Sequence, residues 1–198
     1  MTEMQNYHYS ERLYIRPLTE DDCNDRYLSW FKDPEVTRFL EVLDLTREDS
    51  IRHLKEGLAT QSYFMYALCT RDGDLHIGNV KIGPIVRKHG VSDYSLVIGD
   101  RAYWGKGYAS EATALSTRVG FSEYGIRKFS AGPYSDHYGS MLMLLKAGWV
   151  LEGTLRGQLV RNGKVLDKLC LAYFNPEYSP TGEDEASVQK TVDGPEPK

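Results

Sequence analysis

The feature that most constrains the fold is a strand-like segment followed by two closely spaced glycines and a long helix. Residues 91–98 alternate in part between apolar and polar side chains, as a half-buried strand does. Gly105 and Gly107 stand one residue apart, and residues 110–124 carry apolar or small side chains at helical spacing. Glycine lets a backbone approach a ligand closely, and a helix start offers free N–H groups and the positive end of a dipole. This unit predicts an anion-binding loop, although a plain tight turn between strand and helix fits the same pattern.

The segments around this unit predict a mixed α/β sheet. The expected strands are residues 13–18, 63–70, 76–85, 91–98, 128–131, 149–160 and 165–174. The expected helices begin at Thr19, Asp33, Thr46, Ser110 and Ser140. The last two strands form a hairpin, with Asn162-Gly163 at its tip.

We expect one domain over residues 10–178, preceded by an N-terminal extension (1–9) and followed by a disordered acidic tail (179–198). The tail has five acids and two bases, so it carries −3 of the formal net charge of −4. The rest of the chain is close to neutral, with 22 basic and 23 acidic residues.

Composition excludes several classes of protein. A mildly acidic chain is a poor candidate for binding nucleic acid by neutralising phosphates. Cys23, Cys69 and Cys170 are isolated, and the five histidines are scattered, so we expect no disulfide framework, no metal site and a reducing, cytoplasmic compartment. No apolar run approaches the roughly 18 residues of a membrane span, and the polar start is unlike a signal peptide.

Several motifs, in their order and spacing, resemble the GCN5-related N-acetyltransferase (GNAT) superfamily. Residues 10–18 (SERLYIRPL) resemble the opening strand of the branch that includes ribosomal-protein N-terminal acetyltransferases, and residues 103–112 (YWGKGYASEA) resemble its acetyl-CoA pyrophosphate loop. The superfamily's helix-and-strand signature and closing hairpin are matched by Ser140, Lys146, Gly148, Trp149, Leu151-Glu152-Gly153, Arg156, Gly163 and Asp167. A second resemblance, to acetyltransferases of amino-sugar and surface-polysaccharide pathways, is carried by residues 27–30, 33–36, 39–41, 76–85, 131–134 and 139–140.

The resemblance implies a twisted, mostly antiparallel sheet of about seven strands with a splayed central pair, flanked by four to five helices. It implies transfer of the acetyl group of acetyl-CoA directly to a primary amine of a small molecule, with an amino sugar or nucleotide-linked amino sugar preferred. Two alternatives stay open: a protein N-terminal α-amine acetyltransferase and a non-catalytic CoA-binding module. A sugar nucleotide needs a basic or aromatic patch, whereas a peptide needs an open groove with backbone partners. The oligomeric state is not given by the sequence, and a homodimer is the commonest soluble assembly.

The same resemblance assigns the coenzyme contacts. Pantetheine would pair with the backbone of Leu96, Val97 and Ile98, where the strand is expected to bulge and splay, and an N–H near Val97 or Ile98 would stabilise the oxyanion. The pyrophosphate would lie on the amides of Gly105, Lys106, Gly107, Tyr108 and Ala109, with Trp104 in place of the family's usual Gln or Arg. Ser140 and Lys146 complete the expected coenzyme set.

The resemblance leaves the acid and base roles open. The family's Asn position is His137, and Leu144 stands where many members carry a tyrosine general acid, so that role is empty. Ser140 is our first substitute, before Tyr138 and His137, although a structural role near the helix start would also explain Ser140. The candidate bases are Asp93, Asp136, Glu41 and Asp167, or water. The candidate acceptor residues are Trp30, Phe39, Glu41 and Tyr134, with core packing as the alternative for Trp30 and Phe39.

Overall fold

A computed structural model of the chain describes residues 7–41 and 45–178, so the expected acidic tail lies outside it. One sheet of eight strands organises these residues, in the spatial order β1-β2-β3-β4-β5-β6-β8-β7. The strands are β1 (His8–Tyr9), β2 (Leu13–Pro17), β3 (Phe64–Thr70), β4 (His76–Val86), β5 (Val91–Ile98), β6 (Lys128–Ala131), β7 (Val150–Arg161) and β8 (Lys164–Phe174). All neighbouring pairs are antiparallel except β5 and β6. The predicted mixed, mostly antiparallel sheet is confirmed, and β1 is the additional strand.

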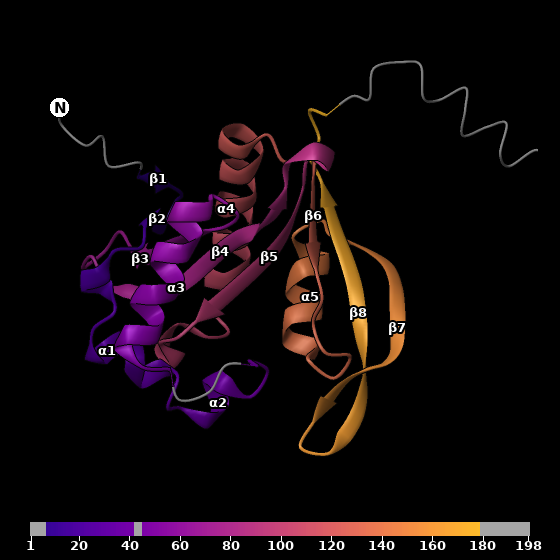
Figure 1. Ribbon diagram of the computed structural model, residues 1–198, viewed down its shortest axis with the longest axis horizontal. Helices are drawn as coiled ribbons and strands as arrows, with labels where there is room; N and C mark the ends of the chain where they lie inside the picture. The colour runs from indigo at the N-terminus through magenta and orange to yellow at the C-terminus, as the bar shows by residue number, and fades with distance from the viewer. Residues whose placement is uncertain (1–6, 42–44, 179–198) are drawn as a thin grey trace, which may run out of the picture.

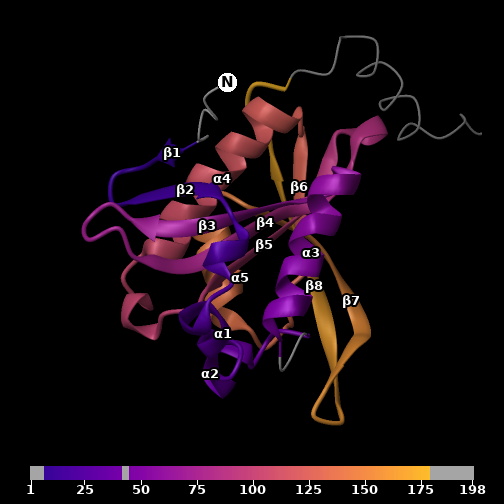
Figure 2. The same ribbon diagram turned by 60° about the vertical axis from the view of Figure 1, so that its left-hand side comes forward.

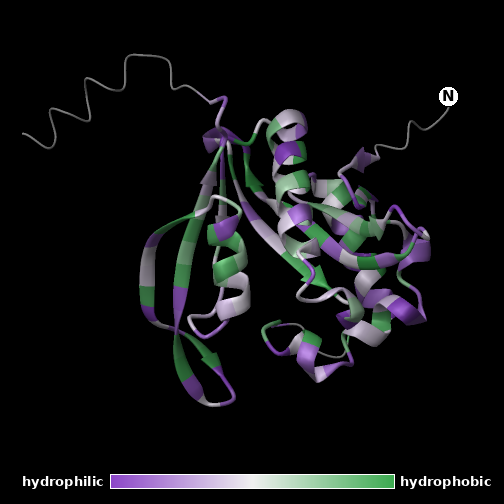
Figure 3. Ribbon diagram, turned by 180° about the vertical axis from the view of Figure 1, so that it is seen from behind, coloured by the Kyte–Doolittle hydropathy of each residue, from purple (hydrophilic) through white to green (hydrophobic). Residues whose placement is uncertain are grey.

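Helices cover both faces of the sheet (Figures 1 and 2). The helices α1 (Asp25–Trp30), α2 (Pro34–Thr37) and α3 (Arg47–Thr60) lie on one face, here called the α3 face. The helices α4 (Tyr108–Tyr124) and α5 (Tyr138–Lys146) lie on the opposite α4 face, which Figure 3 shows from behind. Three short 3₁₀ helices are η1 (Glu20–Asp22), η2 (Arg87–His89) and η3 (Arg101–Tyr103). No helix in the described part of the chain is long and apolar enough to cross a membrane.

The single helix expected from Thr19 is divided in two. Thr19 precedes only the short η1. The carboxylate of Asp22, the last residue of η1, accepts from the backbone N–H of Thr19 and from both terminal nitrogens of Arg16, each bond 2.7–2.8 Å long. Helix α1 then starts afresh at Asn24, whose side chain accepts from the N–H of Tyr27. The other helix starts agree with expectation to within two residues.

The largest core lies between the sheet and α4 (Figure 3). Its fully buried side chains include Leu13, Ile15, Leu68, Ile77, Ile82, Leu115 and Phe129. Gly120 of α4 allows the closest approach, because a Cβ there would overlap the ring of Phe129. Burial of these side chains fixes the sheet against α4 and so fixes the loop that precedes that helix.

The sheet opens at its centre, and this opening positions the site. Strand β6 pairs with β5 only at Val91, Ser92 and Asp93, whereas β5 continues to Ile98. Figure 1 shows the two strands meeting at one end and diverging toward the other. We call the region beyond Asp93, between β5 and β8, the splay. The expected splayed pair is therefore present.

The bulge expected in β5 near Val97 or Ile98 is not there. Strand β5 pairs in continuous register with β4 from Tyr94 to Ile98, and the register shifts instead in β4, between Ile82 and Ile85. The intervening residues explain this position, because Pro84 has no N–H for the ladder and Gly83 adopts a φ of +127°.

Candidate active site

The loop before α4 has the geometry of an anion site. Gly105 and Gly107 adopt φ values of +70° and +81°, which favour glycine, and both are exposed. Gly107 is the N-cap of α4 and supplies no side-chain cap, and its carbonyl accepts the first helical bond, from the N–H of Glu111 at 3.1 Å. The N–H groups of residues 108–110 therefore have no partner within the helix. The predicted loop at residues 105–109 is thus formed and open to solvent.

A pair of side chains from distant parts of the chain holds this loop. Glu111 accepts from the Ser10 hydroxyl at 2.8 Å and from the backbone N–H and Nε of Arg12, both at 2.7 Å. The Arg12 Nη1 donates to the carbonyl of Lys106 at 3.0 Å, and its guanidinium lies 4.3 Å from the centre of the Tyr108 ring. Although partial burial opposes ionisation, these bonds hold the pKa of Glu111 below its usual value. Both residues lie in segments that resemble the superfamily, residues 10–18 and 103–112, but the sequence alone indicated no role for either.

The side chain of Trp104 forms a hydrogen bond with the last residue of β5. Its indole Nε1 donates to the carbonyl of Ile98 at 2.8 Å, while the Gly99 N–H bonds across the sheet to the carbonyl of Ile77 at 2.9 Å. Alternate residues of a strand direct their backbone groups to opposite edges. The backbone groups of Leu96 and the N–H of Ile98 therefore face the splay, whereas those of Val97 face β4. Of the two residues named as candidate oxyanion donors, only Ile98 directs its N–H toward the splay.

Asp93 lies where the splay begins. Tyr94 points to the α4 face, where its hydroxyl bonds Thr113 at 3.1 Å, so the preceding Asp93 points to the α3 face. The carboxylate remains exposed, yet nearby protein displaces enough water to raise its pKa. Lys168 of β8 and Lys81 of β4 oppose this rise by their charge. The raised pKa makes Asp93 a stronger base than an ordinary exposed carboxylate, and the charges of Lys168 and Lys81 act on it.

An aromatic–basic cluster connects the segment after α2 to the hairpin. Its members are Arg38, Phe39, Tyr134, His137 and Arg161. The rings of Phe39 and His137 stack with centres 3.8 Å apart and planes 6° apart. The guanidinium of Arg161 lies 4.6 Å from the Phe39 centre and that of Arg38 lies 5.3 Å away. Burial lowers the pKa of His137, and the nearby Arg161 and Arg38 lower it further against the opposing effect of Asp136, so the ring is neutral at pH 7.

The other carboxylates are less suited to a base. Asp136 forms an ion pair with Arg161, and the Asp167 carboxylate accepts from the N–H of Gly157 at 2.8 Å within the hairpin. Glu41 is exposed at the end of the described segment 7–41.

The remaining predicted residues have mixed outcomes. Trp30 is only 5% exposed and packs with Tyr27 and against Gly99, where a Cβ would overlap its indole. Trp30 is therefore a core side chain, which was the alternative to its expected role in binding the acceptor. Leu144 is buried, Tyr138 is 64% exposed and Lys146 is exposed in the last turn of α5. Ser140 is the third residue of α5, whose N-cap is His137, and no described side chain caps this helix, so the capping role considered for Ser140 is not observed.

A family model and several curated proteins match this chain over most of its length. The family model described as an acetyltransferase (GNAT) domain matches residues 12–150. The probable N-acetyltransferase YjcK of Bacillus subtilis is 28% identical over 175 residues, which cover 83% of this chain and 95% of that protein. The uncharacterized N-acetyltransferase p20 of Bacillus licheniformis is 25% identical, with coverage of 86% and 97%.

Solved structures share the fold. The ribosomal-protein-S5-alanine acetyltransferase of Vibrio fischeri has a TM-score of 0.73 at 18% identity, covering 88% of this chain and 99% of that one. The spermidine N-acetyltransferase of Vibrio cholerae in complex with CoA and spermine has a TM-score of 0.74 at 15% identity, with coverage of 82% and 95%.

Proposed function

Because this chain belongs to the GNAT acetyltransferase family and is an acetyl-CoA-dependent N-acetyltransferase, we propose that its acceptor is the primary amine of a nucleotide-linked amino sugar. The observation that carries the proposal is the aromatic–basic cluster between the segment after α2 and the hairpin. A nucleotide offers a planar base that stacks on aromatic rings and phosphates that pair with guanidinium groups. Phe39, Tyr134 and Arg161 supply both kinds of contact within 6.2 Å of one another.

The cluster continues toward the splay through Lys168. This residue forms a β-bridge with Tyr134, and its charge acts on Asp93. An acceptor with its nucleotide on the cluster would thus extend its sugar along Lys168 toward Asp93. The cations along this path disfavour a polyamine, the ligand of one structurally similar enzyme.

The reaction assigns a task to each group. Asp93 takes a proton from the acceptor ammonium, and the neutral nitrogen attacks the acetyl carbonyl carbon. The Ile98 N–H stabilises the resulting oxyanion. The C–N bond forms, the C–S bond breaks, and the nitrogen releases its second proton to solvent water. Ser140, near the start of α5, is the proposed donor of a proton to the departing sulfur and regains a proton from solvent. The amides of residues 105–109 would hold the coenzyme pyrophosphate.

A turnover assay with acetyl-CoA tests the acceptor class. The panel contains UDP- and dTDP-linked amino sugars, the free amino sugars, spermidine and peptides with free N-termini. We expect the highest kcat/KM for a nucleotide-linked amino sugar. Arg161→Met should raise KM for that acceptor at least about tenfold, equivalent to about 1.4 kcal/mol, and leave KM for acetyl-CoA unchanged. Faster turnover of spermidine or of a peptide would refute the proposed acceptor.

A further inference from the structure

A polar cluster distinct from the aromatic–basic cluster lies on the α3 face of the sheet. It consists of Lys81 of β4, His53 of α3 and Tyr63, which immediately precedes β3. The Lys81 ammonium lies 3.3 Å from His53 Nε2 and 4.1 Å from the centre of the Tyr63 ring. None of these residues has a task in the steps described above.

The hydrogen bonds of this cluster form a chain with a single direction. An ammonium only donates, so Lys81 donates to His53 Nε2, which must carry no proton. The proton of the neutral ring is then on Nδ1, which donates to the Tyr63 hydroxyl at 2.9 Å. The Tyr63 hydroxyl donates in turn to the carbonyl of His53 at 2.6 Å. With Lys81 charged and His53 neutral, each of these three hydrogen bonds has one donor and one acceptor.

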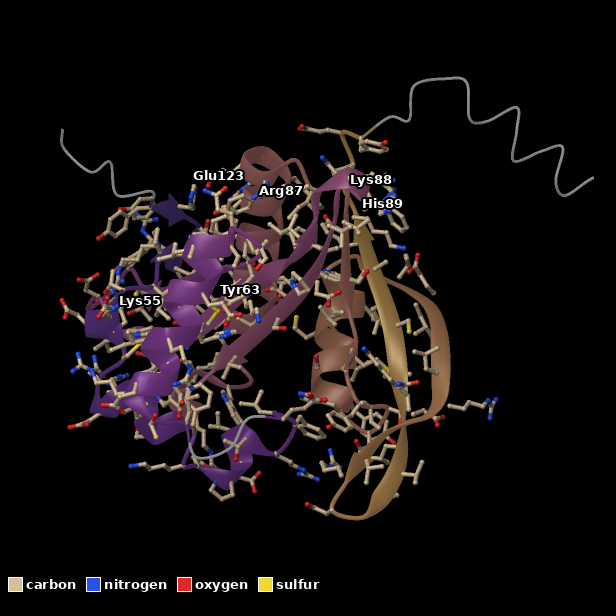
Figure 4. The ribbon with its side chains drawn as sticks, viewed as in Figure 1. Lys55, Tyr63, Arg87, Lys88, His89 and Glu123 are labelled. Atoms are coloured by element: carbon tan, nitrogen blue, oxygen red, sulfur yellow. The ribbon has the colours of Figure 1, made fainter. Side chains whose placement is uncertain are left out.

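Tyr63 has little freedom to move. A Cβ at Gly57 of α3 would lie 2.5 Å from its ring, and a Cβ at Gly83 of β4 would overlap its own Cβ. Figure 4 labels Tyr63 beside α3, over the sheet. The ring is thus a fixed platform for the Lys81 ammonium, and cation–π attraction adds to the hydrogen bond.

Strand register places Asp93 close to Lys81. Lys81 of β4 lies opposite Ser95 of β5, so Asp93, two residues before Ser95, is a diagonal neighbour of Lys81 on the same face of the sheet. The charge of Glu56 of α3 also acts on Lys81 and His53, and the charge of Lys168 of β8 acts on Asp93. Burial lowers the pKa of Lys81, whereas Asp93 and Glu56 raise it. Burial and the charge of Lys81 both lower the pKa of His53, and the charge of Glu56 opposes them. The lowered pKa keeps the His53 ring neutral, as the hydrogen bonds require.

We propose that Lys81 is a positioning residue for acetyl transfer: held by His53 and Tyr63, it keeps Asp93 ionised until the acceptor ammonium arrives. The inference rests on the proposed function, in which Asp93 receives the proton. Acid should disable the arrangement twice, because protonating His53 turns Nε2 into a donor that repels Lys81, and protonating Asp93 removes the base.

The test is the pH dependence of kcat for the full chain with saturating acetyl-CoA and its best acceptor. Lys81→Met removes the charge and keeps the chain length. We expect its acidic limb to move up by about one pH unit, because one nearby opposite charge has been lost. Lys81→Arg should restore the wild-type limb. The control Lys88→Met lies in η2, far from Tyr63 in Figure 4, and should follow the wild type.

Two further variants keep the test decisive. Tyr63→Phe retains the ring beneath Lys81 and removes only the hydroxyl, so the limb should move in the same direction by a smaller amount. A fall in kcat by the same factor at every pH, with an unmoved limb, would show that Lys81 and Tyr63 are merely structural and would overturn the inference. Asp93→Asn separates the two proposals. If it keeps full turnover, the base assignment fails; if it is inactive while Lys81→Met keeps the wild-type limb, only the Lys81 inference fails.

Discussion

Replacing Glu111 by alanine should weaken both the fold and coenzyme binding. The carboxylate accepts three hydrogen bonds of 2.7–2.8 Å, from Ser10 and Arg12, and its side chain is only 15% exposed. A hydrogen bond to a charged group contributes about 1.5–3 kcal/mol. The Arg12 side chain is 40% exposed, so its ion pair is screened and adds at most about 1 kcal/mol. We expect the free energy of unfolding to fall by about 2–3 kcal/mol, because water can partly replace the lost acceptor.

The effect on the coenzyme passes through Arg12. Without Glu111, its guanidinium no longer stays fixed beside the Lys106 carbonyl, so the loop must be ordered when CoA binds. We expect the Kd for CoA to rise about tenfold, or about 1.4 kcal/mol. Calorimetric titration with CoA and urea denaturation measure the two effects. Glu111→Gln keeps one acceptor oxygen and should show about half of each loss. Glu123→Ala, at the other end of α4, should leave the Kd unchanged.

The pH dependence supplies an independent check. The pKa of Glu111 in the folded chain lies below its ordinary value of 4.5, so its contribution to stability is complete above that pH and disappears as the pH falls through the folded value. The stability difference between the wild type and Glu111→Ala should therefore shrink below about pH 4. A variant that binds CoA as tightly as the wild type would refute the proposal that Arg12 and Glu111 hold the loop.

Three further changes test other parts of the site. Gly107→Asp places a side chain at a φ of +81° and a carboxylate beside the free amides of the loop. The affinity for CoA in a thermal-shift titration should therefore fall at least about 100-fold. An unchanged affinity would exclude the loop as the pyrophosphate site. Ser140→Ala should lower kcat at saturating substrates about tenfold or more, and full turnover would remove Ser140 as the proton donor. Gly99→Ala forces a methyl group into the Trp30 ring and should cost about 1–3 kcal/mol in urea denaturation; wild-type stability would mean that this contact relaxes freely.

Local signals in the sequence were enough to predict most of the fold. The glycine pair at 105 and 107 marked the loop before α4, and Asn162-Gly163 marked the hairpin, because positive φ is a local requirement. Thr46 was a correct helix start, since its hydroxyl accepts from the N–H of Asp49 at 3.1 Å. The prediction of one helix from Thr19 was wrong. Thr19 precedes only η1, whose Asp22 bonds Arg16 of the preceding strand, and α1 starts again after its own N-cap, Asn24.

The parts of the site that escaped prediction depend on contacts between distant segments. Arg12 and Glu111 are 99 residues apart, and no local pattern reveals that they meet. Phe39 and Tyr134 were predicted as acceptor residues. The stacking of Phe39 on His137, and the position of the Arg161 guanidinium near both rings, depend on how the hairpin meets the segment after α2. The contacts among Lys81, His53 and Tyr63 likewise follow from the packing of α3 on the sheet.

The open edge of β5 has a consequence for handling the protein. A strand edge with free N–H and C=O groups can pair with any extended chain, which is a common route to aggregation. No strand among residues 7–41 and 45–178 pairs with that edge beyond Asp93, and the indole of Trp104 already donates to the carbonyl of Ile98. The bond from Trp104 therefore shortens the stretch to which a foreign strand could add. A coenzyme lying along the same edge would protect the remainder, so preparations stored with CoA should stay monodisperse longer than those stored without it.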